Sequence, residues 1–428
     1  MDFTVRKKLG KCRRGVLKLE NRQIQTPGCS LYTRGGAVPH LTRDVLHTVA
    51  DLPAIVHLTL ESTVDQPGAE TITKCSCNRI TEFLGLEEYV SYLSIKDPFQ
   101  DIREGYNEEK CVSVWTPGGR KKVDVNLFLT FLQTFKPNIA ECLCDTIPAS
   151  KQTDKRIRKS VDRTLKFLDK CIEEMESKSL SSCNLFGVIE GSNSEKERIR
   201  SASETSKRSV AGFVLEGFSS SECEWNHLLQ RTVEAIPDNK PRLIHGLGSP
   251  EEVVIAVDCG IDLFDSSYPF SELCYIFLNC FTYPCQVAEH GCALNLNWSR
   301  KRFKAELSYS PPAQEPLEQK RKIQDDNLKN SSNGTDNDKG TLYTINLNET
   351  GFSSDFNPVV SGCTCYCCTN HTRAYIHHLL VTKEMLATVL LMVHNLQQYF
   401  QFFAKIRLSI EEDNFEQFKG NVLTGYPL

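Results

Sequence analysis

Short apolar runs alternate with longer amphipathic stretches along the first two-thirds of the chain. The apolar runs have the length of buried strands, and they lie at 54–60, 138–144, 185–190, 212–216, 243–246 and 261–264. Between them, apolar residues recur at helical spacing over 123–135, 154–177, 194–209, 220–235 and 249–257. The last stretch begins with Ser249-Pro-Glu-Glu252, which supplies a capping residue, a proline at the first helical position and acidic residues in the first turn.

Strands that alternate with helices of this length predict parallel βα units. At least five such units follow one another, which favours a (β/α)₈ TIM barrel, an α/β fold, over an open sheet. In such a barrel, the side chains at the carboxyl ends of the strands carry any chemistry. The polar residues at those ends are Asp145, Glu190, Glu216, His245 and Asp265.

A compact group of cysteines near the C-terminus predicts a metal site. Cys363, Cys365 and Cys368 follow the spacing Cys-x-Cys-x-x-Cys, which lets the sulfurs turn toward a common point. Segment 382–406 has no proline or glycine and carries apolar residues at helical spacing, so we expect His394 to lie on a helix. Three thiolates and an imidazole complete the tetrahedron of a structural Zn²⁺ site and leave no open position.

Neighbouring side chains are alternative ligands. Cys367 competes with the three cysteines of the spacing, and other histidines compete for the fourth position, namely His371, His377 and His378. Without a metal, the same cysteines would pack as small buried apolar side chains. The spacing favours zinc over this alternative.

Composition sets the class of protein. The chain has 428 residues, of which 40% are hydrophobic and 24% charged, as in a soluble globular protein with a large core. The formal net charge is −4, so RNA contact would depend on local basic runs such as 120–122, 156–159 and 300–302, and such runs are more often solvated faces. The 19 cysteines are scattered and odd in number, and the first residues lack an apolar signal core. We therefore expect a reducing compartment, with thiols free or bound to metal.

Residues 308–340 differ from the rest of the chain. They are rich in proline, asparagine, serine and charged residues and contain few apolar side chains. Because such a segment cannot repay its ordering entropy, we predict a disordered loop insertion. A zinc-binding helical subdomain is expected at 355–425, within a single barrel domain that spans 1–428. The apolar run at 386–393 is too short and too polar at its ends to cross a bilayer.

Five motifs, in order, resemble the tRNA-guanine transglycosylase family. The cysteine and histidine spacing, with Arg373-Ala-Tyr-Ile-His-His378 inside it, is similar to the family's zinc signature. The other motifs are Leu185-Phe-Gly-Val-Ile-Glu-Gly191, Gly212-Phe-Val-Leu-Glu-Gly217, Lys240-Pro-Arg-Leu-Ile-His-Gly-Leu-Gly-Ser-Pro250 and Gly260-Ile-Asp-Leu-Phe-Asp-Ser266. The resemblance covers nearly the whole chain. It implies a TIM barrel with a zinc-binding subdomain and the exchange of guanine in tRNA for a modified base, queuine in eukaryotes.

The resemblance implies a reaction that needs two carboxylates, a nucleophile and an acid–base group. It places Asp265 at the nucleophile's position. The family's second aspartate lies in Leu-Thr-Asp-Ser-Gly-Gly-Phe-Gln, and the corresponding stretch here is Leu93-Ser-Ile-Lys-Asp-Pro-Phe-Gln100. Ile95 therefore replaces the acid, and both glycines are lost. Asp97 is a poor substitute because the following proline restricts its backbone.

Further departures fall on the base-reading positions. Cys144 stands in place of an aspartate, Glu190 in place of the base-recognising glutamine and His245 in place of the stacking methionine, while Ser271 replaces an arginine suited to phosphate. Such a pocket should lose discrimination by hydrogen bonding. This pattern resembles a non-catalytic subunit, with Asp265 a relict. We therefore expect a heterodimer with the catalytic queuine tRNA-ribosyltransferase subunit, acting at the anticodon wobble position of tRNA.

Two alternatives remain. The chain is an active base-exchange enzyme if Asp265 is the nucleophile and another carboxylate, such as Asp97 or Asp145, is the acid. It is a zinc-stabilised scaffold if it has left tRNA biology altogether.

The resemblance also bears on tRNA contact and on location. Basic side chains, among them Lys301, Arg302, Lys304 and Arg373, would contact tRNA phosphates, although Arg373 instead braces the cysteine turn in an equally favoured interpretation. The resemblance implies a cytoplasmic location, with peripheral association with the mitochondrial outer membrane.

Overall fold

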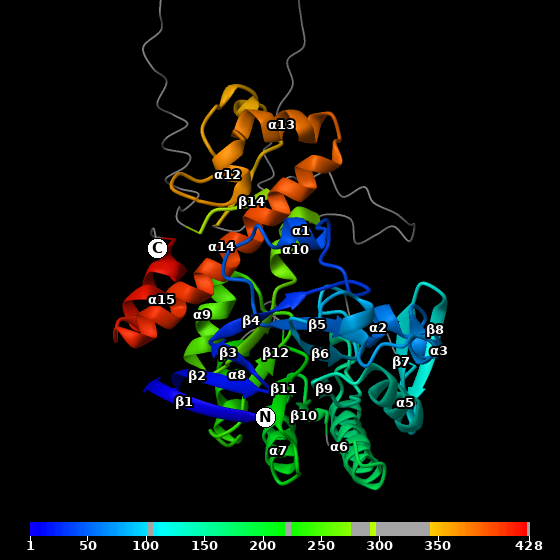
Figure 1. Cartoon of the computed structure of the whole chain (residues 1–428). Coiled ribbons are helices and arrows are strands. Elements are labelled where there is room, and N and C mark those ends of the chain that lie inside the picture. The colour runs from blue at the N-terminus through cyan, green and yellow to red at the C-terminus, as the bar shows by residue number, and fades with distance from the viewer. Residues whose placement is uncertain (101–105, 181, 219–223, 275–291, 297–342, 426–428) are drawn as a thin grey trace, which may run out of the picture.

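Eight parallel strands close into a barrel in the order β10-β11-β12-β13-β4-β5-β6-β9 (Figure 1). The computed structural model describes residues 1–428 apart from 101–105, 181, 219–223, 275–291, 297–342 and 426–428, so the insertion predicted at 308–340 lies outside the described residues. The strands are β4 (Gly28–Tyr32), β5 (Ile55–Thr59), β6 (Val90–Ser94), β9 (Ile139–Glu141), β10 (Asn184–Ile189), β11 (Gly212–Leu215), β12 (Arg242–Ile244) and β13 (Leu263–Asp265). The predicted TIM barrel is confirmed.

Six of the eight barrel strands coincide with the predicted apolar runs, and β4 and β6 do not. Every residue of both strands is buried, but their sequences, Gly-Cys-Ser-Leu-Tyr and Val-Ser-Tyr-Leu-Ser, interrupt the apolar run with serines. The serines have partners in the fold: the Ser91 hydroxyl donates to Oδ1 of Asn138 at 3.0 Å. A strand whose polar side chains are satisfied across the barrel has no local apolar signature.

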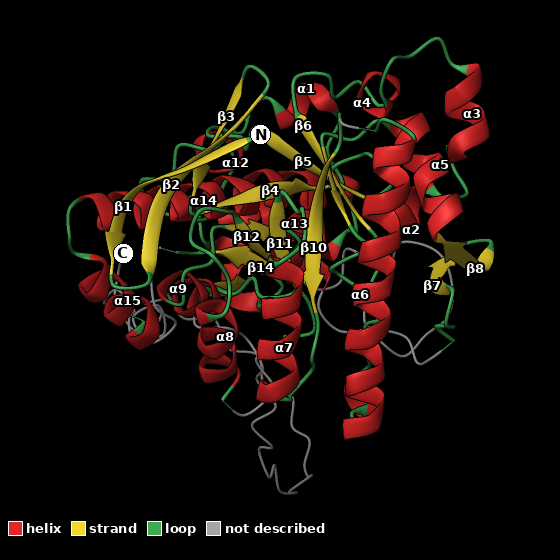
Figure 2. Cartoon of the chain, turned by 90° about the horizontal axis from the view of Figure 1, so that it is seen from below, coloured by secondary structure: helices red, strands yellow, loops and turns green. Residues whose placement is uncertain are grey.

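Long helices surround the barrel (Figure 2). They include α5 (Val125–Phe135), α6 (Asp154–Ser177), α7 (Glu195–Ser206), α8 (Trp225–Glu234) and α9 (Pro250–Asp258), each within about five residues of its predicted bounds. The start of α9 is a capping box, in which Ser249 and Glu252 each bond the other's backbone N–H. Shorter helices lie among the connecting loops, namely α1 (Arg43–Leu46), α2 (Leu60–Thr63), α3 (Gly68–Lys74), α4 (Ile80–Phe83) and α10 (Tyr268–Cys274).

Antiparallel strands outside the barrel were not predicted. They are β1 (Asp2–Leu9), β2 (Cys12–Leu19) and β3 (Arg22–Thr26) in one sheet, β7 (Cys111–Thr116) with β8 (Gly119–Asp124), and β14 (Cys292–Leu294) with β15 (Thr344–Asn346). A buried ion pair joins the first sheet to the barrel, since Nε of Arg13 on β2 donates to Oδ1 of Asp262 at 2.8 Å. Neither side chain is exposed to solvent.

The C-terminal region is helical and lies against one end of the barrel (Figure 1). It contains α12 (Tyr366–Asn370), α13 (Arg373–Val381), α14 (Met385–Glu411) and α15 (Phe415–Thr424). The helix expected around His394 is α14, which runs from α12 and α13 to contact β2 and β4. Among the described helices, none combines the length and the apolar character that a membrane span requires. The subdomain limits of 355–425 stay a prediction.

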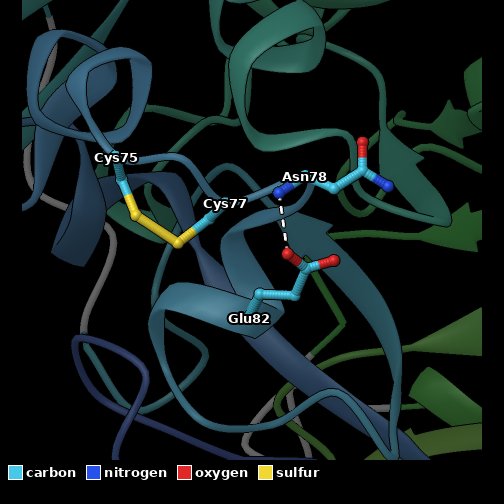
Figure 3. The surroundings of a disulfide bond; sticks show 4 residues. All are labelled: Cys75, Cys77, Asn78 and Glu82. Atoms are coloured by element: carbon cyan, nitrogen blue, oxygen red, sulfur yellow. Dashed lines mark hydrogen bonds between the residues drawn. A yellow bond between two sulfur atoms is a disulfide. The ribbon is translucent and has the colours of Figure 1, made fainter.

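Cys75 and Cys77 correct the expectation that all thiols are free or bound to metal. They form a disulfide just after α3, with their Cα atoms 5.2 Å apart (Figure 3). This separation lies within the range that a disulfide spans. The following residue, Asn78, donates its backbone N–H to the carboxylate of Glu82 at 2.7 Å. Cysteine count and spread could not reveal this pair, because pairing depends on how the chain turns between the two residues.

Candidate metal centre and barrel-mouth site

Cys363, Cys365, Cys368 and His394 converge on one point. The sulfurs of Cys363, Cys365 and Cys368 lie 3.8, 3.4 and 3.3 Å, respectively, from Nδ1 of His394. All four donor atoms lie within 4.8 Å of one another. A tetrahedral ion that holds sulfur and nitrogen at about 2.0–2.3 Å separates its ligands by roughly 3.5 Å. The four side chains therefore fit a single metal ion.

Local structure orients each of these ligands. Cys365 is the capping residue of α12, and its sulfur accepts the backbone N–H of Cys368 at 3.4 Å. The sulfur of Cys363 accepts from Nε2 of Gln398 at 3.3 Å. Nε2 of His394 donates to the carbonyl of Leu294 at 2.7 Å, which fixes the tautomer and leaves Nδ1 toward the sulfurs. Metal-binding thiolates usually accept hydrogen bonds from nearby N–H groups, and a metal-binding histidine usually donates its other ring N–H to a neighbouring acceptor. Both features are present here.

The alternative ligands lie outside this group. Cys367 is buried, and burial raises the pKa of its thiol and keeps it neutral. Nδ1 of His377 is bonded to the carbonyl of Leu347 at 2.8 Å. His371 and His378 both stack against Tyr375, with ring centroids 5.1 and 6.5 Å away.

Arg373 contacts the segment that leads into the cysteine turn. Its Nη1 lies 3.0 Å from Oδ2 of Asp355, and its Nη2 donates to the carbonyl of Val359 at 3.0 Å. These contacts support the bracing interpretation over a free phosphate contact. The other basic positions proposed for tRNA, at 301, 302 and 304, lie outside the described residues.

Asp265 lies at the carboxyl end of β13 and is tightly bound. Its Oδ1 accepts from the backbone N–H of Ser267 at 2.9 Å and from the Ser267 hydroxyl. Its Oδ2 accepts from the backbone N–H of Gly246 at 3.2 Å and lies 3.4 Å from Nδ1 of His245. Burial favours the neutral acid, but the hydrogen bonds outweigh it and lower the pKa of Asp265 to about 2. The carboxylate is therefore ionised and strongly stabilised.

His245 joins Asp265 to a second carboxylate. Its Nε2 lies 2.8 Å from the Tyr92 hydroxyl and 3.6 Å from Oε2 of Glu141. Burial alone would lower its pKa, yet the hydrogen bonds to both carboxylates raise it to about 10. His57 stacks on this ring with centroids 5.0 Å apart, and burial followed by the charge of His245 lowers the pKa of His57 to about 3. One histidine is thus cationic and the other neutral at pH 7.

Two more glutamates belong to this end of the barrel. Burial and then the charge of Glu141 raise the pKa of Glu216 to about 8, and burial also raises the pKa of Glu190. Glu141 and His57 were missed from the sequence because the runs predicted at 138–144 and 54–60 placed them inside strands, and Tyr92 was missed because no strand was predicted around it. A polar residue inside an otherwise apolar strand is the signal that could have found them.

Asp145 lies apart from this group, although it also follows a strand. Its carboxylate is bonded to Arg156 at 2.7 and 2.8 Å and to Arg163 at 3.1 Å. These ion pairs tie the loop after β9 to helix α6. Asp145 is therefore a structural residue.

Residues 93–100, the stretch predicted to correspond to the family's acid–base motif, hold no free carboxylate, and residues 93–95 and 97 of this stretch are buried. Ile95, directly after β6, is 1% exposed. The carboxylate of Asp97 accepts from the Tyr32 hydroxyl at 2.7 Å, and Arg34 lies 3.7 Å from its other oxygen.

Comparison of the sequence with known proteins identifies its relatives. The sequence model of a family described as queuine tRNA-ribosyltransferase matches residues 8–428. A human protein described as queuine tRNA-ribosyltransferase accessory subunit 2 is 38% identical over 434 residues, which cover 98% of each chain. Proteins with the same description from Danio rerio and Trichoplax adhaerens are 38% and 36% identical, over 96% and 95% of each chain.

Proposed function

Because this chain belongs to the queuine tRNA-ribosyltransferase family, we propose that it is the non-catalytic subunit of a heterodimer. Its partner is the catalytic member of the family, and the pair exchanges guanine for queuine at the wobble position of tRNA. The relatives described as accessory subunits support this assignment over nearly the whole chain. The same comparisons disfavour a scaffold outside tRNA biology.

The observation that carries the proposal is Ile95. The family's second carboxylate is replaced by a buried apolar side chain that cannot exchange a proton. The nucleophile position is also altered, because Asp265 is held by Ser267, Gly246 and the cationic His245. Interactions that lower a carboxylate's pKa stabilise its charge and weaken it as a nucleophile. We infer that the site is degenerate.

We further propose that the Cys₃His group binds Zn²⁺. The donor set of three sulfurs and one imidazole is typical of structural zinc, and it leaves no position for substrate. The ion would hold α12 against α14 and so shape the face of the chain that meets its partner or tRNA. The expected cytoplasmic location and peripheral contact with the mitochondrial outer membrane stay predictions, which fractionation of cells would test.

Exchange of labelled guanine into tRNA tests the assignment directly. The chain alone should incorporate no label above background, because it lacks the acid–base carboxylate. Mixing it with the catalytic family member should give sustained exchange. Incorporation by the chain alone would refute the proposal and support the alternative in which Asp265 is the nucleophile. A mixture no more active than the catalytic member alone would refute the accessory role.

Asp265→Asn in this chain should leave exchange by the mixture within about twofold of the unchanged pair, because Asp265 attacks no substrate. Removing a true nucleophile lowers kcat by several orders of magnitude. The same substitution at the matching aspartate of the catalytic partner is the control. If Asp265→Asn in this chain lowered the exchange rate of the mixture by more than about 100-fold, the nucleophile would belong to this chain.

A further inference from the structure

Donor atoms at the barrel mouth form a group that the proposed function does not use. Glu141 ends β9, Glu216 follows β11 and His245 follows β12. The closed barrel brings one ligand atom of each within 4.8 Å of the others. We propose that Glu141, Glu216 and His245 bind a divalent transition-metal ion, separate from the Cys₃His ion.

The chemistry of the donor set selects the ligand. Two carboxylates and one imidazole suit first-row ions such as Mn²⁺ and Zn²⁺ and contain no thiolate. Donors at about 2.1 Å from an ion lie no more than roughly 4.2 Å apart. Glu141 and His245, at 3.6 Å, already meet this limit. No pair of ligand atoms is more than 4.8 Å apart, about 0.6 Å beyond the limit. Three protein ligands leave room for water in the remaining positions.

Asp265 orients the histidine for this role. The carboxylate of Asp265 accepts a hydrogen bond from Nδ1 of His245. The backbone N–H groups of Gly246 and Ser267 donate to the same carboxylate and fix its position. Nε2 of the same ring lies 2.8 Å from the Tyr92 hydroxyl and 3.6 Å from Oε2 of Glu141. A bound ion would replace the proton on this nitrogen and the contact with Tyr92. A carboxylate bonded to the outer nitrogen of a metal-binding histidine is the usual second-shell arrangement. Asp265, at the position of the family's nucleophile, would therefore act as a residue that positions His245.

Two buried acceptors beside the group have no hydrogen-bond partner. Oε1 of Glu190, a residue only 2% exposed, is one of them, and the charge of Glu190 acts on Glu216. The other is Nδ1 of His57, whose ring stacks on His245. The Ser94 hydroxyl gives its proton to the carbonyl of Lys96, so Nε2 of His57 must donate to Ser94 and Nδ1 keeps a bare lone pair. Water bound to a divalent ion would supply the O–H donors that these two atoms lack.

Mn²⁺ is the probe, because it prefers oxygen and nitrogen ligands to the thiolates of the other site. The full-length chain, with its Cys₃His ion retained, is titrated with Mn²⁺ while free Mn²⁺ is followed by electron paramagnetic resonance. We expect one Mn²⁺ per chain, bound more tightly as pH rises because metal competes with protons for these ligands.

Variants locate the ion. Asp265→Asn should weaken Mn²⁺ binding by about 10–100-fold, as for other second-shell partners, and Glu216→Gln should weaken it further. Glu251→Gln is the matched control, since Glu251 is a half-buried glutamate on α9 outside the group. Glu141→Gln replaces Glu216→Gln if the latter loses its cooperative thermal transition. Absence of Mn²⁺ binding by the unchanged chain, or equal binding by the Glu216→Gln and Glu251→Gln variants, would overturn the proposal.

Discussion

Cys368→Ser should abolish metal binding at the proposed Cys₃His site and unfold α12 and α13, together with the part of α14 that carries His394. The sulfur of Cys368 lies 3.3 Å from Nδ1 of His394, so its loss opens the tetrahedron. Structural zinc contributes folding free energy directly, with apparent binding of about 10–16 kcal/mol in small zinc domains. This is far more than the roughly 1 kcal/mol of a typical substitution. Elemental analysis should find about one metal ion fewer per chain, and hydrogen exchange should lose protection in these helices.

Cys367→Ser is the matched control for this prediction. Cys367 is the neighbouring cysteine, is also buried and has its sulfur outside the converging group. The variant should keep its metal and the protection of α12 to α14. If Cys368→Ser retained the ion while Cys367→Ser lost it, the assignment of the third sulfur would be wrong.

Asp262→Ala should cost about 3–5 kcal/mol of unfolding free energy, because it removes the buried carboxylate that pairs with the buried Arg13. Only the exposed carboxylate of Asp238, 3.7 Å from Nη1, would then remain near the Arg13 charge. The side chains of Arg13 and Asp262 are inaccessible to solvent, and Asp262 also accepts the backbone N–H of Arg242 at 2.7 Å. Denaturation by urea measures the loss. The double variant Arg13→Met/Asp262→Leu should lose less than the sum of the two single changes, because no charge is left buried without a partner.

Asp413→Ala serves as the exposed comparison. Asp413 pairs with Lys7 at 2.8 Å, but its side chain is 64% exposed. Solvent-exposed ion pairs contribute about 0–1 kcal/mol. Equal losses for Asp262→Ala and Asp413→Ala would show that the Arg13 pair does not hold the N-terminal sheet to the barrel.

Much of this fold was readable from the sequence because its signals are local. Helix α6 (Asp154–Ser177) has the bounds that its periodicity predicted, and the capping box at Ser249 was visible as a short motif. The spacing of Cys363, Cys365 and Cys368 placed three sulfurs in one turn. Each signal depends on residues only a few positions apart, whose relative directions are set by helix or turn geometry.

Only the tertiary structure decided which polar residues meet at the barrel mouth. Asp145 follows a strand as Glu216 does, yet Arg156 and Arg163 remove it from the site. Tyr92 and His245 share a hydrogen bond across 153 positions of sequence. Such pairs form because closure of the barrel superimposes the ends of distant strands, and no spacing along the chain records that closure. The sequence by itself determined the βα alternation and the spacing of the four residues proposed to bind metal, since each depends on near neighbours. It also predicted that Ile95 stands in place of the family's acid, which depends on residue identity alone. Burial and long-range contacts exist only in the folded chain. They keep Asp265 ionised, bring it within hydrogen-bonding distance of His245 and place three glutamates at the same end of the barrel.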